Sequence, residues 1–104
     1  MEKKDLEIID DKKPGSLKLI IKGLVDSNTA HELQHKLEKS LKEKQTNIIL
    51  NMSQVEYITS AGIRVILKAY KDITNAGGKF GIEMPSENVK KVLSITSLDE
   101  MFII

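Results

Sequence analysis

The most constraining feature of the sequence is a short apolar run near its middle, where Ile48, Ile49 and Leu50 follow one another directly. A short apolar run without alternation is typical of a strand that is covered on both faces of a sheet. Before and after this part of the chain, apolar residues recur every three or four positions, which is the period of an amphipathic helix. We therefore expect residues 47–52 to form the central strand of a sheet with helices packed on it.

The other elements follow from changes of this period and from turn residues. Segments 6–9 and 17–22 are predicted strands, and the turn residues 10–15 between them predict a hairpin. The remaining predicted elements are a helix from Asn28 to about Lys44, a helix from about Ser60 that ends at 75–78, a strand at 80–84, a helix that opens at Ser86, and a short turn around 98–101. This order indicates an α/β domain with its helices packed on the sheet.

The size and charge of the chain exclude several functional classes. A chain of 104 residues has the size of one domain, so we expect residues 1–104 to form a single domain. Its 16 basic and 15 acidic residues are interspersed, which leaves no basic patch for nucleic acid. There is no cysteine, no apolar segment approaches the length of a membrane span, and the start Met-Glu-Lys-Lys-Asp lacks a signal peptide's apolar run. These features predict a cytoplasmic protein without a membrane span or a nucleic-acid partner.

One motif matches a sequence pattern of zinc proteases. His31-Glu32-Leu33-Gln34-His35 matches H-E-x-x-H, in which two histidines on one helical face bind zinc and the glutamate activates water. On a helical wheel both histidines lie about 160° from Leu33, so we expect both imidazoles to face solvent. A catalytic zinc also needs a third protein ligand in a walled cleft, and the sequence has no further histidine. We therefore predict no metal site and no cofactor, with adventitious nickel or zinc binding by the exposed pair as the alternative.

The turn at residues 23–27 carries one acidic side chain, Asp26, between the second predicted strand and the first predicted helix. By itself this turn is typical of a helix cap, which Asp26, Ser27 or Asn28 would provide. The catalytic alternative is a triad of Asp26, Ser60 and one histidine. We disfavour the triad because the histidines are expected to face away from the sheet and no glycine elbow surrounds Ser60.

Ser60 carries the strongest functional signal. The segment Ile58-Thr59-Ser60-Ala61-Gly62 delivers this serine to the first turn of the second predicted helix. A serine at such a position often only caps the helix, because its hydroxyl accepts a bond from a free first-turn amide. The same amides and the helix dipole would tolerate a phosphate, which adds about −1.5 to −2 charge to the surface. Capping and a phosphorylation switch are therefore the two alternatives for Ser60.

Four motifs follow one another in a fixed order along the chain. They are Gly23-Leu24-Val25-Asp26, Ile58-Thr59-Ser60-Ala61-Gly62-Ile63, Gly77-Gly78-Lys79-Phe80, and Leu93-Ser94-Ile95-Thr96-Ser97-Leu98 continuing to Phe102. In order and spacing they resemble the STAS domains (sulfate transporter and anti-sigma factor antagonist), in particular the stand-alone bacterial anti-sigma factor antagonists. The resemblance covers nearly the whole chain. It implies a mixed β-sheet with helices packed mainly on one face.

The resemblance also implies a binding module without catalysis. In the family, an anti-sigma factor serine kinase phosphorylates the serine that matches Ser60, and a PP2C-type phosphatase removes the phosphate. The unphosphorylated protein binds the kinase, which then releases its sigma factor. The implied partner surface comprises Asp26, Ser27, Thr59, Ser60, Ala61, Gly62 and Arg64. The alternative with the same fold is a constitutive scaffold, as a STAS subunit of a lipid-transport ABC complex or a stress-sensing complex.

Three positions depart from the family pattern. Thr59 and Asn51 stand where the family commonly has aspartate, and Ser97 replaces a common glycine. With fewer acidic neighbours, the loop around Ser60 is expected to be less negative and to be recognised by a different kinase. Thr59 becomes a second, weaker candidate for phosphorylation. Arg64 lies one helical turn after Ser60, where it would face a partner or pair with a phosphate on Ser60.

Overall fold

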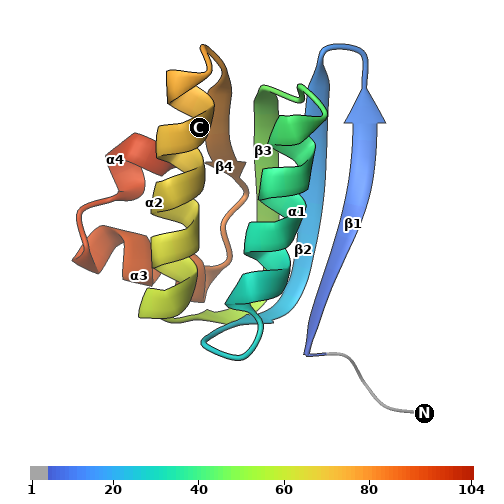
Figure 1. The fold of residues 1–104 in the computed structure, drawn as a ribbon. Coiled ribbons are helices and arrows are strands. Elements are labelled where there is room, and N and C mark those ends of the chain that lie inside the picture. The colour runs from blue at the N-terminus through green and yellow to red at the C-terminus, as the bar shows by residue number, and fades with distance from the viewer. Residues whose placement is uncertain (1–4) are drawn as a thin grey trace.

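A four-stranded sheet with helices in front of it organises the molecule, as the computed structural model of residues 5–104 shows (Figure 1). The strands lie in the order β1-β2-β3-β4. The elements are β1 Leu6–Lys13, β2 Ser16–Val25, α1 Ala30–Lys42, β3 Asn47–Ile58, α2 Ser60–Asn75, β4 Lys79–Glu83, α3 Glu87–Ile95 and α4 Asp99–Phe102. Most of the charged start of the chain, from which we predicted the absence of a signal peptide, lies outside the described residues.

The sheet is mixed, which confirms the predicted fold class. β1 and β2 pair antiparallel, whereas the β2 and β3 pair and the β3 and β4 pair are parallel. Parallel neighbours cannot be joined by a tight turn, and α1 and α2 provide the two crossover connections. These two helices contact each other and lie on the same face of the sheet (Figure 1).

The hairpin is longer than predicted, because its turn consists only of Pro14 and Gly15. Residues 10–13, predicted as turn, are paired strand residues, and the pairing continues until Lys13 lies opposite Ser16. An edge strand tolerates charged residues well, because their side chains reach water beside a paired backbone. The prediction from turn-forming residue types therefore ended β1 too early, whereas the prediction of a hairpin is confirmed.

β3 is an inner strand, but the helices cover only one of its faces. Ile48 and Leu50 are fully buried, whereas Ile49 points the opposite way and is half-buried. Ile49 lies opposite Gly81 of β4, and a Cβ on Gly81 would lie 2.6 Å from Cγ2 of Ile104. The prediction of a strand covered on both faces is therefore wrong for Ile49. On the far face it is the Ile104 side chain, not a helix, that lies next to Gly81.

β3 also extends beyond its predicted end and reaches Ile58. Its first half pairs with both β2 and β4, but β4 stops opposite Asn51, and the second half pairs with β2 alone. The start of α3 lies beside this second half, where the hydroxyl of Ser86 donates to the carbonyl oxygen of Val55 at 2.7 Å. α3 opens at Ser86, as predicted, and Ser86 caps it by accepting a bond from the amide of Val89. The long β3 places its final residue beside the end of β2.

Three aromatic rings join the last part of the chain to α2. Tyr70, Phe80 and Phe102 pack edge to face, with ring centroids 6.5, 5.5 and 6.2 Å apart. Edge-to-face pairs add about 1 kcal/mol each beyond the burial of their area. The amide of Ile104 then donates to the carbonyl oxygen of Ile82 at 3.0 Å, which fixes the chain end beside β4. The short turn predicted at 98–101 is the helix α4.

Candidate functional site

Two loops meet at the edge of the sheet where β2 and β3 end. Val25 and Ile58 are paired neighbours in these parallel strands, so the segments that follow them leave the sheet side by side. The amide of Thr59 donates to the carbonyl oxygen of Val25 at 3.0 Å and joins the two loops directly. The structure therefore brings together the Asp26 turn and the Ser60 segment, as the partner surface implied by the resemblance requires.

Gly62 lets the first turn of α2 lie directly on the end of β2. A Cβ on Gly62 would lie 2.7 Å from Cγ1 of Val25, 2.8 Å from Cγ1 of Ile58 and 3.0 Å from the carbonyl oxygen of Val25. Such distances leave no space for a side chain. The glycine at position 62 therefore has a packing reason. Gly62 is buried, so it supports the site from beneath.

Asp26 orders the turn before α1 through its own carboxylate. Its Oδ1 accepts bonds from the amides of Asn28 at 2.9 Å and Thr29 at 3.2 Å. The hydroxyl of Thr29 donates to the carbonyl oxygen of Leu24 at 2.7 Å and accepts from the amide of Asp26 at 3.0 Å. The carbonyl oxygen of Asp26 also accepts from the amide of Ala30 at 2.8 Å, so Asp26 caps this end of the helix, as one of the three predicted candidates. The regular helix begins only after Thr29, whose side chain makes no capping bond, and Ser27 is exposed at the tip of the turn.

Ser60 is the first residue of α2 and does not cap it. The N-cap is Thr59, in an extended conformation with φ −105° and ψ 178°, and its side chain makes no capping bond. The Oγ1 atom of Thr59 is buried without a hydrogen-bond partner among the described residues. Ser60 itself is exposed. Simple capping therefore does not account for Ser60, and the buried hydroxyl of Thr59 disfavours Thr59 as a phosphorylation site.

The first-turn amides of α2 lack a hydrogen-bond acceptor among the described residues. The first bond that closes the helix runs from the amide of Ile63 to the carbonyl oxygen of Thr59 at 3.0 Å. Within residues 5–104, the amides of Ser60, Ala61 and Gly62 have no backbone acceptor, and the first turn contains no acidic side chain. Unpaired amides at a helix N-terminus carry partial positive charge and favour an anion. No residue pattern had indicated that Thr59 would leave these amides uncapped.

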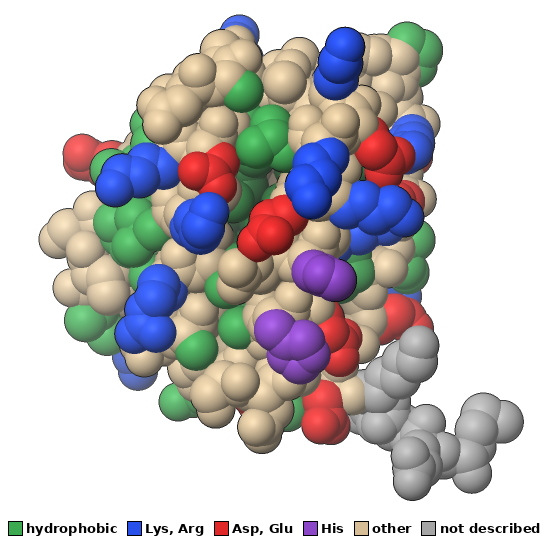
Figure 2. All heavy atoms as spheres, viewed as in Figure 1, with side chains coloured by type: hydrophobic (Ala, Val, Ile, Leu, Met, Phe, Trp, Pro, Cys, Tyr) green, Lys and Arg blue, Asp and Glu red, His purple; other side chains and the backbone are tan. Residues whose placement is uncertain are grey.

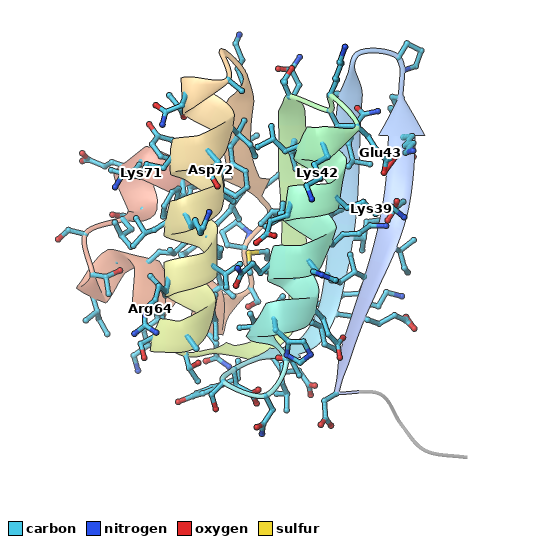
Figure 3. The ribbon with its side chains drawn as sticks, viewed as in Figure 1. Lys39, Lys42, Glu43, Arg64, Lys71 and Asp72 are labelled. Atoms are coloured by element: carbon cyan, nitrogen blue, oxygen red, sulfur yellow. The ribbon has the colours of Figure 1, made fainter. Side chains whose placement is uncertain are left out.

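Arg64 adds a positive charge to the same end of α2. It lies four residues after Ser60 and near the start of the helix, where its side chain is exposed (Figure 3). It forms no ion pair within the described part of the chain. In an α-helix, side chains four residues apart are neighbours, so Arg64 can reach a charge that is added to Ser60.

Asn51 lies far from this edge of the sheet. Its side-chain amide donates to Oε2 of Glu83 at 3.0 Å, and its oxygen accepts from the hydroxyl of Ser53 at 2.8 Å. Lys18 also contacts Oε2 of Glu83 at 3.0 Å, and its hydrogen bond is the main cause that lowers the pKa of Glu83. Asn51 precedes Ile58 by seven strand positions, or about 23 Å. The prediction that Asn51 makes the Ser60 loop less negative is therefore wrong. Of the two positions where the family commonly has aspartate, Thr59 and Asn51, only Thr59 lies at the site.

The two histidines lie side by side on the outer face of α1, as predicted (Figure 2). Neither hydrogen-bonds to Ser60 or to Asp26 in the described part of the chain. No cluster of three or more residues of the types that bind metals occurs within residues 5–104. The described part of the chain therefore contains neither the triad nor the three-ligand zinc site of a protease.

Comparison with known proteins agrees with this fold. Residues 7–104 match the STAS domain model. The chain is 26% identical over 97 residues to BtrV of Bordetella bronchiseptica, which is provisionally named an anti-sigma factor antagonist. The aligned region covers 93% of this chain and 84% of BtrV. The chain is 24% identical over 95 residues to the anti-sigma F factor antagonist of Paenibacillus polymyxa, covering 90% of this chain and 81% of that one. The chain belongs to the STAS domain family.

The fold is shared with SpoIIAA, an anti-sigma factor antagonist of known structure. The unphosphorylated form of SpoIIAA superimposes with a TM-score of 0.82 at 17% identity and covers 94% of this chain and 86% of its own. The phosphorylated form, from Bacillus, gives a TM-score of 0.76 at 16% identity, with 94% and 89% covered. Among the described residues of the present chain, no helix is long and apolar enough to cross a bilayer.

Proposed function

We propose that this chain is an anti-sigma factor antagonist whose binding to an anti-sigma factor kinase is switched off when Ser60 is phosphorylated. Membership of the STAS family and the names of its relatives support the antagonist role. The existence of SpoIIAA in phosphorylated and unphosphorylated forms supports a phosphorylation switch on this fold. The observation that carries the proposal is the exposed Ser60 at the uncapped N-terminus of α2, beside the Asp26 turn.

The switch works through charge at a surface that a partner covers. A kinase transfers the γ-phosphoryl group of ATP to the Ser60 hydroxyl, and the phosphate adds about −1.5 to −2 charge there. The free amides of the first turn and Arg64 offset this charge within the chain, so the fold tolerates it. A partner built to cover the neutral hydroxyl meets an additional, desolvated charge, and its affinity falls. A PP2C-type phosphatase restores the neutral serine.

The experiment measures binding to the anti-sigma factor kinase recovered from the source cells with the untagged chain as bait. The Ser60→Ala variant is expected to bind as the unmodified chain does, and Ser60→Asp is expected to bind at least about tenfold more weakly. Ser94→Asp is the matched control, because it adds the same charge to an exposed position of α3 outside the implied partner surface, and it should bind as the unmodified chain does.

Two results would overturn the proposal. The first is equal incorporation of labelled phosphate by Ser60→Ala and the unmodified chain, which would place the modified residue elsewhere. The second is recovery of a transporter ATPase with an affinity that Ser60→Asp leaves unchanged, which would favour the constitutive scaffold.

A further inference from the structure

The histidine pair on α1 has a geometry that the proposed function does not use. His31 and His35 are four residues apart in a regular helix, so their side chains project from one face, with Cβ atoms about 6 Å apart. Both side chains are exposed, and Figure 2 shows them as neighbours on the surface of α1. Two imidazoles at this spacing can bind one metal ion together from a single helical turn.

The helix that carries the pair is held rigidly against the sheet. Leu33 and Leu37 alternate with the histidines along α1 and are buried beneath it. Anchors on both sides of His35 fix the backbone between the two imidazoles. A chelate then requires only side-chain rotation, which keeps the entropy cost of metal binding small.

The neighbouring charged groups leave the imidazole nitrogens accessible. Gln34 donates to Glu38 at 2.8 Å, and Lys36 forms an ion pair with Asp10 of β1 at 2.7 Å. Because the Lys36 ammonium is held toward β1, its charge is partly neutralised and directed away from α1's outer face. Glu32 is exposed and contributes a negative charge next to the pair. In the part of the chain that the structure describes, neither imidazole forms an ion pair.

We propose that His31 and His35 form a two-ligand surface site for a divalent transition metal, with water completing its coordination. Imidazole suits copper, nickel and zinc, whereas magnesium and calcium prefer oxygen ligands. The absence of a third protein ligand within residues 5–104 makes the site open and separates it from a catalytic zinc centre. For a nitrogen site of this kind, affinity rises from nickel to copper and is lower for zinc than for copper.

The test is calorimetric titration of the untagged, full-length chain with copper, nickel, zinc or magnesium chloride. We expect one copper ion per chain and no binding of magnesium. His31→Ala and His35→Ala should each weaken copper binding by at least about tenfold, because each leaves a single ligand without its chelating partner. Glu32→Gln should bind copper with an affinity close to that of the unmodified chain.

A matched control keeps two histidines on the helix but separates them. The double variant His35→Ala and Lys39→His places histidines eight residues apart, about 12 Å along the axis, which is too far for one ion. Lys39 is exposed on α1 and forms no ion pair among residues 5–104, so the fold should tolerate this change (Figure 3). The double variant should bind copper as weakly as His35→Ala alone.

Three results would overturn the proposal. They are retention of copper binding by the separated pair, unchanged binding by both single alanine variants, and a stoichiometry of one metal per two chains, which would assign the site to a contact between copies. A supporting result independent of calorimetry is an increase in the urea midpoint of unfolding with copper that disappears in His35→Ala. Each variant's far-ultraviolet circular dichroism without metal establishes that α1 is intact.

Discussion

The two junctions that meet at the sheet edge are built in opposite ways. After β2, the Asp26 carboxylate and the Thr29 hydroxyl satisfy the backbone groups of the turn that leads into α1. After β3, the Thr59 hydroxyl is buried without a partner within residues 5–104, and the first amides of α2 have no acceptor there. The comparison shows that one junction is completed by its own side chains, whereas the other leaves a hydroxyl and the first helix amides without partners among the described residues.

The largest effect is expected where the two junctions touch, at Gly62. Gly62→Ala introduces a Cβ 2.7 Å from Val25 Cγ1, so we expect the free energy of unfolding to fall by about 2 kcal/mol. Urea unfolding monitored by circular dichroism measures this change. Combining it with Val25→Ala should give a loss smaller than the sum of the single losses, because one of the three close contacts is removed. Strict additivity would show that Gly62 is not needed for this close approach.

Removing the carboxylate of the completed junction is expected to have a smaller cost. Asp26→Ala leaves the amides of Asn28 and Thr29 without their acceptor, which should lower the free energy of unfolding by about 1 kcal/mol. Ser27→Ala is the control, because Ser27 is exposed at the tip of the same turn, and its effect should be close to zero. Equal losses in the two variants would contradict the role assigned to Asp26.

At the junction after β3, removing a buried polar group should stabilise the protein. Thr59→Val replaces the unpaired, buried hydroxyl by a methyl group of similar shape, and we expect the free energy of unfolding to rise by up to about 1 kcal/mol. Denaturant unfolding of the two proteins under the same conditions measures this difference. A loss of stability would mean that the Thr59 hydroxyl has a partner after all, and the contrast between the junctions would disappear.

The smallest effect is expected at the residue with the strongest functional signal. Ser60→Ala removes an exposed hydroxyl that does not cap α2, so the free energy of unfolding should change by less than about 0.5 kcal/mol. The same denaturation experiment applies. A loss above about 1 kcal/mol would restore the capping role, because that is the typical cost of deleting a helix cap.

The fold could be predicted largely because local patterns and tertiary structure agree. The hairpin, the two crossover helices and the opening of α3 at Ser86 each had a local signal in the sequence. The end of β1 was misplaced because Asp10 and Lys13 are turn-forming types that an edge strand also accepts. The partial exposure of Ile49 had no local signal either, because it depends on which face α2 covers after the chain crosses over.

Only part of the candidate site could be predicted from the sequence. Ser60 and Asp26 were identified from residue type and position, and the structure brings their loops together. The lack of a cap at Thr59 and the contact of Gly62 with Val25 depend on atoms from two separate strands. For Asn51 the sequence indicated a neighbour that the structure does not place at the site. Asn51 was counted as a neighbour of the Ser60 loop, although it lies seven residues before the end of β3. Sequence identifies candidate residues, but the strand ends decide which of them meet.

The central claim is that the open amides of α2 receive a phosphate on Ser60. Its most direct test is the nuclear magnetic resonance spectrum of nitrogen-15-labelled protein carrying phosphoserine at position 60, compared with the unmodified protein. The account predicts downfield shifts of the amide protons of Ala61 and Gly62, with resonances across the sheet unchanged. Unchanged amide protons in the first turn, or shifts spread throughout the sheet, would contradict it.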